Sequence, residues 1–163
     1  MHSWHNALFP KGYSGLRKIN TATFRGEETM QIVGGAMGRE IVYYEALPRN
    51  ILEKEMQQFL DWFNSEKPTL IKACIAHLWF VIIHPFEDGN GRITRAITDL
   101  VLSHIENSKI SRLYSMSSTI NENKKAYYTA LENTTGYVKK DGNPLDITLW
   151  CDWFLNTLLN FRT

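Results

Sequence analysis

Residues 84–95 read His84-Pro85-Phe86-Glu87-Asp88-Gly89-Asn90-Gly91-Arg92-Ile93-Thr94-Arg95. The apolar residues before and after this stretch recur at helical spacing, first up to Ile83 and then from Ile97 onward. Glycine next to asparagine is typical of a turn between two regular elements. The stretch is therefore predicted to be a loop that joins two helices, with the second helix beginning near Gly91.

Four residues of this loop favour an anion-binding site. Gly89 and Gly91 tolerate positive φ, so neighbouring backbone N–H groups can converge on an anion. The helix that begins there adds unpaired N–H groups and the positive end of its dipole. Arg92 and Arg95 are three residues apart, so both lie on the first helical turn and can reach a polyphosphate. Together these residues predict phosphate binding.

A histidine and a carboxylate in the same loop add chemistry to that site. His84, with an ordinary pKa of about 6.5, can be neutral and accept the proton of a hydroxyl group. Asp88 offers the hard oxygen ligand that suits Mg²⁺ on substrate phosphates. Each residue alone also has a structural reading, as a turn, a helix cap or a solvated charge. Their joint occurrence favours function, and Phe86 is interpreted as the buried anchor of the loop.

Composition and charge limit the other classes of function. The chain has 163 residues, of which 44% are hydrophobic and 21% charged, as expected for one globular domain over residues 1–163. A formal net charge of +1 without a basic run argues against nucleic-acid binding. The longest strongly apolar stretch, Ala73 to Ile83, is too short to cross a membrane.

The two cysteines, Cys74 and Cys151, have neither metal-ligand nor disulfide-framework spacing. They are predicted to be free structural thiols, and the N-terminus shows no signal segment, which together favour a cytoplasmic location. His77 is expected to pack in the core, the N-terminal histidines show no partner in the sequence, and Glu87 is expected to be solvated. The sequence leaves the oligomeric state open, including a homo-oligomer.

The remaining pattern predicts a mainly α fold with a small β-hairpin. Residues 1–20 are turn-rich, extended segments are expected at 21–24, 31–33 and 40–44, and Gly34, Gly35 and Gly38 favour a hairpin between the last two. After Pro48 the pattern is helical. Helices are expected from about residue 49, from the turn containing Pro68, from about residue 91, over 119–132, and after a cap at Asp146.

Residues 84–95 resemble the signature of the Fic family, His-x-Phe-x-(Asp/Glu)-Gly-Asn-Gly-Arg-x-x-Arg, at every specified position. The resemblance implies the Fic fold of bacterial members, a helical bundle with a hairpin called the flap beside the motif loop. It also implies transfer of AMP from ATP, with Mg²⁺, to a Ser, Thr or Tyr hydroxyl of a target protein. The target would pair with the flap, at about Gly38–Tyr44, as an added strand.

The resemblance also implies a role for each site residue. His84 would deprotonate the target hydroxyl, and Asp88 would hold Mg²⁺. The phosphates of ATP would be bound by Gly89, Asn90, Gly91, Arg92 and Arg95. Tyr128 would contact the nucleotide base, while packing of Tyr127 and Tyr128 in the core is the structural alternative.

The sequence departs from the pattern of many Fic proteins in one regulatory element. Many Fic proteins carry an inhibitory helix with the pattern (Ser/Thr)-x-x-x-Glu-(Gly/Asn), and none precedes the flap here, so an N-terminal segment of a longer protein is expected to be missing. Ser118–Asn123 fits that pattern, but it lies within the domain and is interpreted as a helix start.

Two alternative functions stay open. One is transfer of another phosphate-containing moiety or removal of AMP, and the other is a toxin-type nucleotide-binding module that a partner controls.

Overall fold

The computed structural model describes residues 1–34, 39–106, 116–135 and 146–159. Most of these residues are helical, and two antiparallel two-stranded sheets complete the described part, which confirms the predicted class. The elements in chain order are α1 (His2–Leu8), β1 (Tyr13–Ser14), β2 (Arg17–Lys18), β3 (Gln31–Gly34), β4 (Ile41–Glu45), α2 (Arg49–Ser65), α3 (Leu70–Ile83), α4 (Asn90–Glu106), α5 (Met116–Glu122), α6 (Lys124–Thr135) and α7 (Thr148–Leu159).

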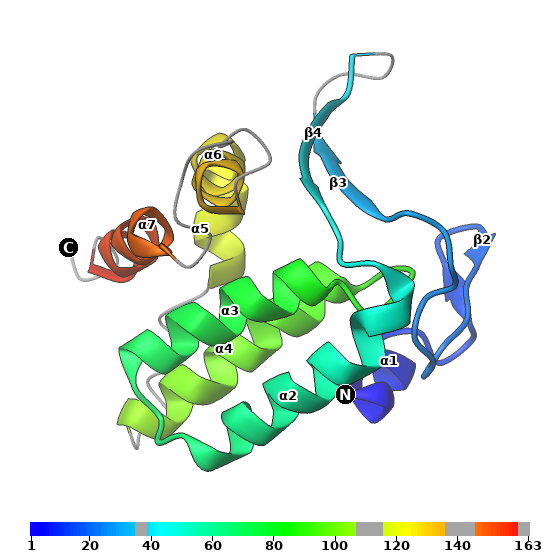
Figure 1. Cartoon of the computed structure of the whole chain (residues 1–163), viewed down its shortest axis with the longest axis horizontal. Coiled ribbons are helices and arrows are strands. Elements are labelled where there is room, and N and C mark those ends of the chain that lie inside the picture. The colour runs from blue at the N-terminus through cyan, green and yellow to red at the C-terminus, as the bar shows by residue number, and fades with distance from the viewer. Residues whose placement is uncertain (35–38, 107–115, 136–145, 160–163) are drawn as a thin grey trace.

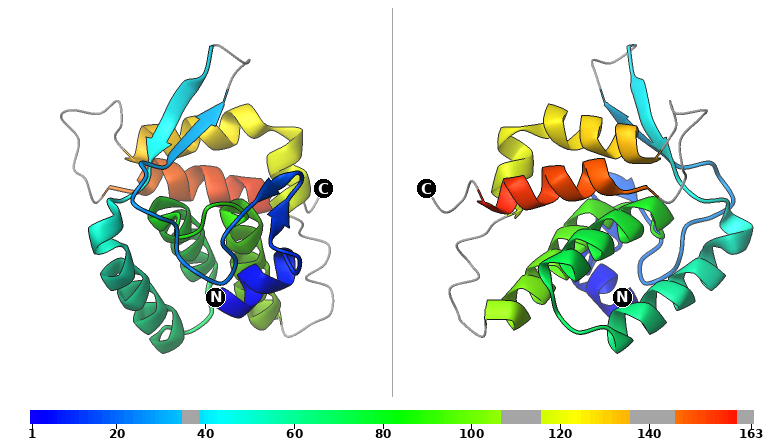
Figure 2. Two further views of the ribbon diagram at one scale, coloured as in Figure 1. Left: turned by 90° about the vertical axis from the view of Figure 1, so that its right-hand side faces the viewer. Right: turned by 60° about the vertical axis from the view of Figure 1, so that its left-hand side comes forward.

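Helix α3 is the centre of the molecule, with α2 and α4 on one side and α6 and α7 on another (Figures 1 and 2). One buried cluster joins α2, α3 and α4 through Phe59, Phe80 and Ile97. A second cluster joins α3 to α6 and α7 through Leu131 and Trp150, among others. Because α3 contributes to both clusters, nearly all its faces are buried, which explains its continuous apolar sequence.

The turn between α2 and α3 is closed by polar groups at both helix ends. Thr69 is the N-cap of α3, and its side chain accepts a hydrogen bond of 3.0 Å from the backbone N–H of Lys72. The buried Lys72 ammonium donates to the carbonyls of Phe63 and Glu66, at 2.6 Å each, and so places a cation at the C-terminus of α2. Pro68 precedes this cap and lies two residues before Leu70, the first residue of α3, so its predicted place in the first helical turn is wrong by two residues.

Three other predicted elements differ from the structure. The turn-rich residues 1–20 contain helix α1 and the short hairpin β1–β2. Residues 21–24 form no strand, because Ala22 has a φ of 56°, in the left-handed region. The helix predicted over 119–132 is two helices, because Asn123 accepts a 3.1 Å hydrogen bond from the backbone N–H of Ala126 and starts α6 anew.

The predicted hairpin is confirmed as the pair β3–β4, which projects from the helical body (Figure 1). Gln31 lies opposite Glu45 and Gly34 lies opposite Ile41, with an irregularity in the register between Ile32 and Val33. We call this hairpin the flap. Gly35 and Gly38, which were expected in its connection, lie outside the described residues.

Several smaller predictions can be compared with the structure. Asp146 accepts a 3.0 Å hydrogen bond from the backbone N–H of Thr148 at the start of α7, as predicted for a cap. Cys74 and Cys151 are free thiols, as predicted, although their sulfur atoms lie only 3.2 Å apart between α3 and α7. Within the described ranges, none of the helices combines the length and the apolar character that a membrane span requires.

Candidate active site

His84 ends helix α3 in a left-handed conformation, with φ 47° and ψ 59°. Its backbone N–H donates to the carbonyl of Phe80 at 3.1 Å, which closes the last turn of the helix. Its Nδ1 atom lies 3.4 Å from the carbonyl of Val81. A carbonyl can only accept, so this contact calls for the proton on Nδ1 and leaves the lone pair on Nε2 as the proton acceptor.

Burial lowers the pKa of His84 to about 4. The contact with the Val81 carbonyl and the charge of Asp88 act in the opposite sense, while the nearby charge of Arg25 adds to the lowering. The half-buried imidazole is therefore neutral at neutral pH, the form in which Nε2 can accept a proton.

Asn90 holds the motif loop closed by bonding to the backbone of Phe86. Its side-chain oxygen accepts from the Phe86 N–H at 2.9 Å, and its side-chain NH₂ group donates to the Phe86 carbonyl at 2.7 Å. The Phe86 ring is fully buried and stacks on the His5 ring, with centroids 4.2 Å apart and an interplanar angle of 10°. Asn90 thus shapes the loop from within, and its predicted contact with phosphate stays a prediction.

Gly89 occupies a position that no other residue fits without strain. Its φ is 81°, and a Cβ atom there would lie 2.7 Å from the Cε2 atom of Phe9. Its carbonyl accepts from the backbone N–H of Ile93 at 3.0 Å, so it begins the hydrogen bonding of α4. The backbone N–H of Gly89 donates to Oδ1 of Asp88 at 2.5 Å. In this arrangement the Asp88 carboxylate accepts that N–H, and the predicted contact of Gly89 with phosphate stays a prediction.

Asp88 is held by two donors to its carboxylate and one to its carbonyl. Ser14 donates its hydroxyl to Oδ2, the Gly89 N–H donates to Oδ1, and His5 Nε2 lies 3.0 Å from the carbonyl oxygen. Burial alone would raise the pKa of Asp88, but the hydrogen bonds from Ser14 and Gly89 and the charges of Arg92 and Arg17 outweigh it and lower the pKa. The carboxylate is therefore ionised at neutral pH.

The carboxylate of Asp88 is a suitable ligand for an Mg²⁺ ion that is also bound to a nucleotide. Among the residues that the structure describes, no three His, Cys, Asp or Glu side chains gather into a metal cluster. A single carboxylate cannot complete the octahedral shell of Mg²⁺, which commonly takes one or two carboxylates and fills its other positions with waters and substrate phosphates. The ionised, half-buried Asp88 suits that mode of binding.

Two contacts of the loop were missed from the sequence. His5 was expected to lack a partner, yet it is fully buried, and its Nδ1 accepts from the backbone N–H of Ala22 at 3.0 Å. That contact places the ring proton on Nε2, which donates to Asp88. Glu87 was expected to be solvated, but it accepts from the backbone and side-chain nitrogens of Asn20 at 3.1 and 2.8 Å. The sequence carried one signal for His5, its spacing from Phe9, which lies about one helical turn later.

The two motif arginines differ in burial and in their neighbours. The exposed Arg92 guanidinium lies over the Phe9 ring, 4.5 Å from its centroid. Arg95 is half-buried, and its charge acts on the buried His77, whose pKa is lowered to about 3 by burial first and by Arg95 second. His77 is a core histidine, as expected, with Nδ1 2.9 Å from the Thr98 hydroxyl. The predicted shared contact of both arginines with a polyphosphate stays a prediction.

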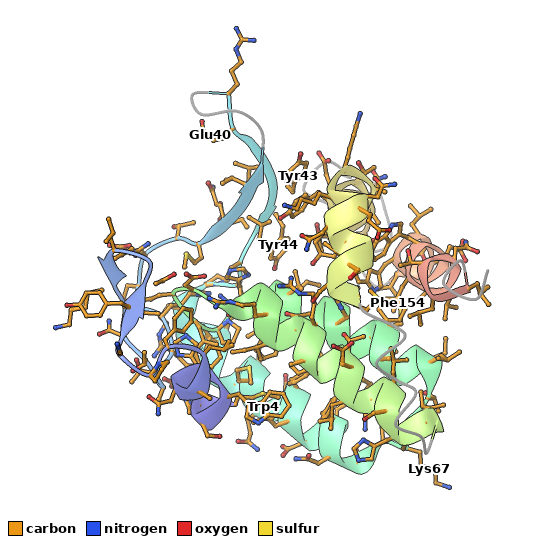
Figure 3. The ribbon with its side chains drawn as sticks, turned by 180° about the vertical axis from the view of Figure 1, so that it is seen from behind. Trp4, Glu40, Tyr43, Tyr44, Lys67 and Phe154 are labelled. Atoms are coloured by element: carbon orange, nitrogen blue, oxygen red, sulfur yellow. The ribbon has the colours of Figure 1, made fainter. Side chains whose placement is uncertain are left out.

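Tyr128 lies between helix α6 and the flap. Its ring stacks on Tyr43 of β4, with centroids 4.8 Å apart and an interplanar angle of 6°, and Figure 3 shows Tyr43 directed toward α6. The neighbouring Tyr44 is buried and donates its hydroxyl to the carbonyl of Ile82 at 3.0 Å, in the last turn of α3. Tyr127 is buried in the core and Tyr128 is half-buried and packs against that core, so the predicted contact of Tyr128 with a nucleotide base stays a prediction.

Known proteins resemble parts of this chain in sequence. A protein adenylyltransferase Fic of Nematostella vectensis is 42% identical over 55 residues, which are 31% of this chain and 13% of that protein. A protein of Aquifex aeolicus (strain VF5), named "Probable protein adenylyltransferase", is 29% identical over 130 residues, 78% of this chain and 32% of that protein. The chain thus spans about a third or less of the length of these relatives.

A solved structure and a family model extend the likeness to the fold. The crystal structure of a Fic family protein from Desulfovibrio desulfuricans G20 matches with a TM-score of 0.74 and 27% identity. The match covers 99% of this chain and 44% of that one. The model of the Fic/DOC family matches residues 2–102, which include the flap and the whole motif loop. The chain belongs to the Fic/DOC family.

Proposed function

We propose that the protein is a protein adenylyltransferase, which transfers AMP from ATP, with Mg²⁺, to a Ser, Thr or Tyr hydroxyl of a target protein. The observation that carries this proposal is the state of His84, a neutral imidazole whose Nε2 can accept a proton. The ionised carboxylate of Asp88 lies in the same loop, which leads into the N-terminus of α4. The names of the partial relatives, which are protein adenylyltransferases, point the same way.

The chemical step can be written in terms of this chain's own groups. The target hydroxyl gives its proton to Nε2 of His84 as its oxygen attacks the α-phosphorus of ATP. The bond between the α-phosphorus and the bridging oxygen breaks, and pyrophosphate leaves with the two electrons of that bond. A neutral histidine is required for this role, which agrees with the lowered pKa of His84.

Binding and orientation of ATP fall to the rest of the loop. Asp88 would hold the Mg²⁺ ion, which supplies neutralisation of the phosphate charge when it is bound. The N-terminus of α4 with Arg92 and Arg95 would hold the phosphates, and Asn90 keeps the loop in the shape that this needs. Tyr128 would contact the base at the edge of the site, where its ring already stacks on Tyr43.

The flap is the proposed dock for the target. It projects from the helical body (Figure 1), and an extended peptide can add to the edge of such a two-stranded sheet through main-chain hydrogen bonds. The stacking of Tyr43 on Tyr128 and the bond from Tyr44 to α3 fix the base of the flap against the site. A target strand on the flap would thus be held close to His84.

The test is incubation of the protein and a host lysate with MgATP, followed by mass spectrometry of intact proteins and peptides. A gain of the mass of one AMP on a hydroxyl residue supports the proposal. The matched control is His84→Ala, which should lower transfer by at least about a hundred-fold, the loss typical of an acid–base catalyst, and keep ATP affinity within a few-fold. Another added mass would favour a different phosphate-containing donor. Nucleotide binding without transfer by the wild type would favour the partner-controlled module.

A further inference from the structure

We propose that Arg25 is a positioning residue for His84, which it holds in place by joining the end of α3 to the end of the flap. The inference rests on the proposed function, because His84 is taken as the base in the transfer reaction. Arg25 lies in the connection between β2 and β3, far from the motif in the sequence. Nothing in the pattern of residues 84–95 points to it.

Three hydrogen bonds connect Arg25 to the site. Its Nε atom donates to the carbonyl of His84 at 2.9 Å, and its backbone N–H donates to the carbonyl of Pro85 at 2.9 Å. Its Nη2 atom donates to the carbonyl of Leu47, two residues after the last residue of β4. The residue is 3% exposed, so water cannot take the place of the guanidinium at these carbonyls without opening the structure. Arg25 therefore links Leu47, which follows the flap, to His84, the residue proposed to be the base.

The conformation of His84 explains why such a link is needed. A left-handed conformation is unfavourable for a residue with a Cβ atom, and it persists where surrounding contacts over-determine it. The N–H of His84 is fixed by Phe80 on one side, and its carbonyl is fixed by Arg25 on the other. With both ends of the residue held, the direction of the Cα–Cβ bond, and hence of the imidazole, is defined.

The planar guanidinium suits this task better than an ammonium would. Two of its nitrogens donate in fixed, diverging directions to carbonyls of different segments. A cation at this place also complements the negative end of the α3 dipole. Lysine keeps the positive charge but ends in a single nitrogen on a flexible stem, so it cannot hold both carbonyls in the same geometry. Arg25→Lys thus separates geometry from charge.

The experiment compares wild type, Arg25→Lys, Arg25→Gln and the matched control Arg49→Lys in AMP transfer. Arg49 lines the same cavity of about 240 Å³ as Arg25, but its ion pair is with Glu53 on the surface of α2. We expect Arg25→Lys to lower kcat by about ten-fold or more with KM for ATP within about two-fold, because the base is misplaced and the phosphate site is not. Arg49→Lys should match the wild type. An unchanged kcat in Arg25→Lys would overturn the proposal, as would a KM for ATP that rises in proportion to any loss.

A second measurement needs neither nucleotide nor turnover. Hydrogen exchange of the His84 N–H, followed by NMR, should be at least about ten-fold faster in Arg25→Lys than in the wild type, since the end of α3 loses its restraint. The N–H of Phe80, inside the same helix, is the internal reference and should exchange at the same rate in Arg25→Lys and in the wild type. Equal protection of His84 in both proteins would refute the positioning role. If the wild type transfers no AMP, the proposed function fails, and this measurement still decides the role of Arg25.

Discussion

Replacement of Gly89 by alanine should destabilise the protein strongly. The residue has a φ of 81°, a conformation that costs a residue with a Cβ atom about 1–2 kcal/mol. The new methyl group would lie 2.7 Å from Cε2 and 3.2 Å from Cζ of Phe9. Phe9 is 4% exposed and packed, so its displacement should cost about 1–3 kcal/mol more. The expected loss of unfolding free energy is the total of both, about 2–5 kcal/mol.

Urea and thermal unfolding would measure this loss. For a domain of this size, each kcal/mol corresponds to about 2–4 °C in Tm, so Gly89→Ala should lower Tm by about 4–20 °C. Gly91→Ala is the matched control. Gly91 lies in α4 without a positive φ, and a Cβ atom there meets only the end of the Arg95 side chain, at 3.3 Å. Alanine should change stability there by no more than about 1 kcal/mol. Equal stabilities of the two variants would refute the described shape of the loop.

Three further outcomes are expected. Asp88→Asn should weaken Mg²⁺-dependent ATP binding and abolish AMP transfer, and an unchanged Mg²⁺ titration would assign the metal to another ligand such as Glu87. Glu122→Gly should leave the transfer rate nearly unchanged, because Glu122 is an exposed residue at the end of α5, and strong activation would identify Ser118–Asn123 as an inhibitor. The unfolding free energy should fall as pH drops from about 6.5 toward 4. In the folded protein His84 and His77, with pKa values of about 4 and about 3, stay neutral over this range, whereas in the unfolded chain the same histidines bind protons. Urea titrations at pH 7 and pH 5 check this, and the fall should be smaller in His84→Gln.

The fold could be predicted where local pattern and tertiary packing agree. The apolar period of α2 and α4 and the glycines beside β3 indicated the helices and the hairpin, because each element buries the face that its sequence marks. The turns expected around Pro10, Gly12 and Gly15 are present, but helix α1 was missed for the opposite reason. It is stabilised by contacts of His5 and Phe9 with the distant motif loop.

The site could be predicted only as far as the contiguous motif extends. His84, Asp88 and the glycines are adjacent in sequence, so their joint chemistry was visible at once. Ser14, His5 and Arg25 meet the same loop across sequence separations of 74, 83 and 59 residues. Their residue types are ordinary for surface or core positions, and apart from the helical spacing of His5 and Phe9 no periodicity marks them. Such contacts follow from the fold and not from any local pattern.

The contacts that hold the motif loop go mainly to its backbone. Arg25 bonds the carbonyls of His84 and Pro85, and His5 bonds that of Asp88. Asn90 takes the N–H and carbonyl of Phe86. A loop fixed in this way stays rigid without using the Nε2 atom of His84, which is the atom that the proposed reaction requires. The exceptions are the carboxylates, since Asp88 accepts from the Ser14 hydroxyl and the Gly89 N–H, and Glu87 accepts from Asn20. A carboxylate oxygen with a second lone pair can keep such a bond while it binds a metal ion. Rigid positioning and available chemistry therefore coexist in the loop because they use different atoms.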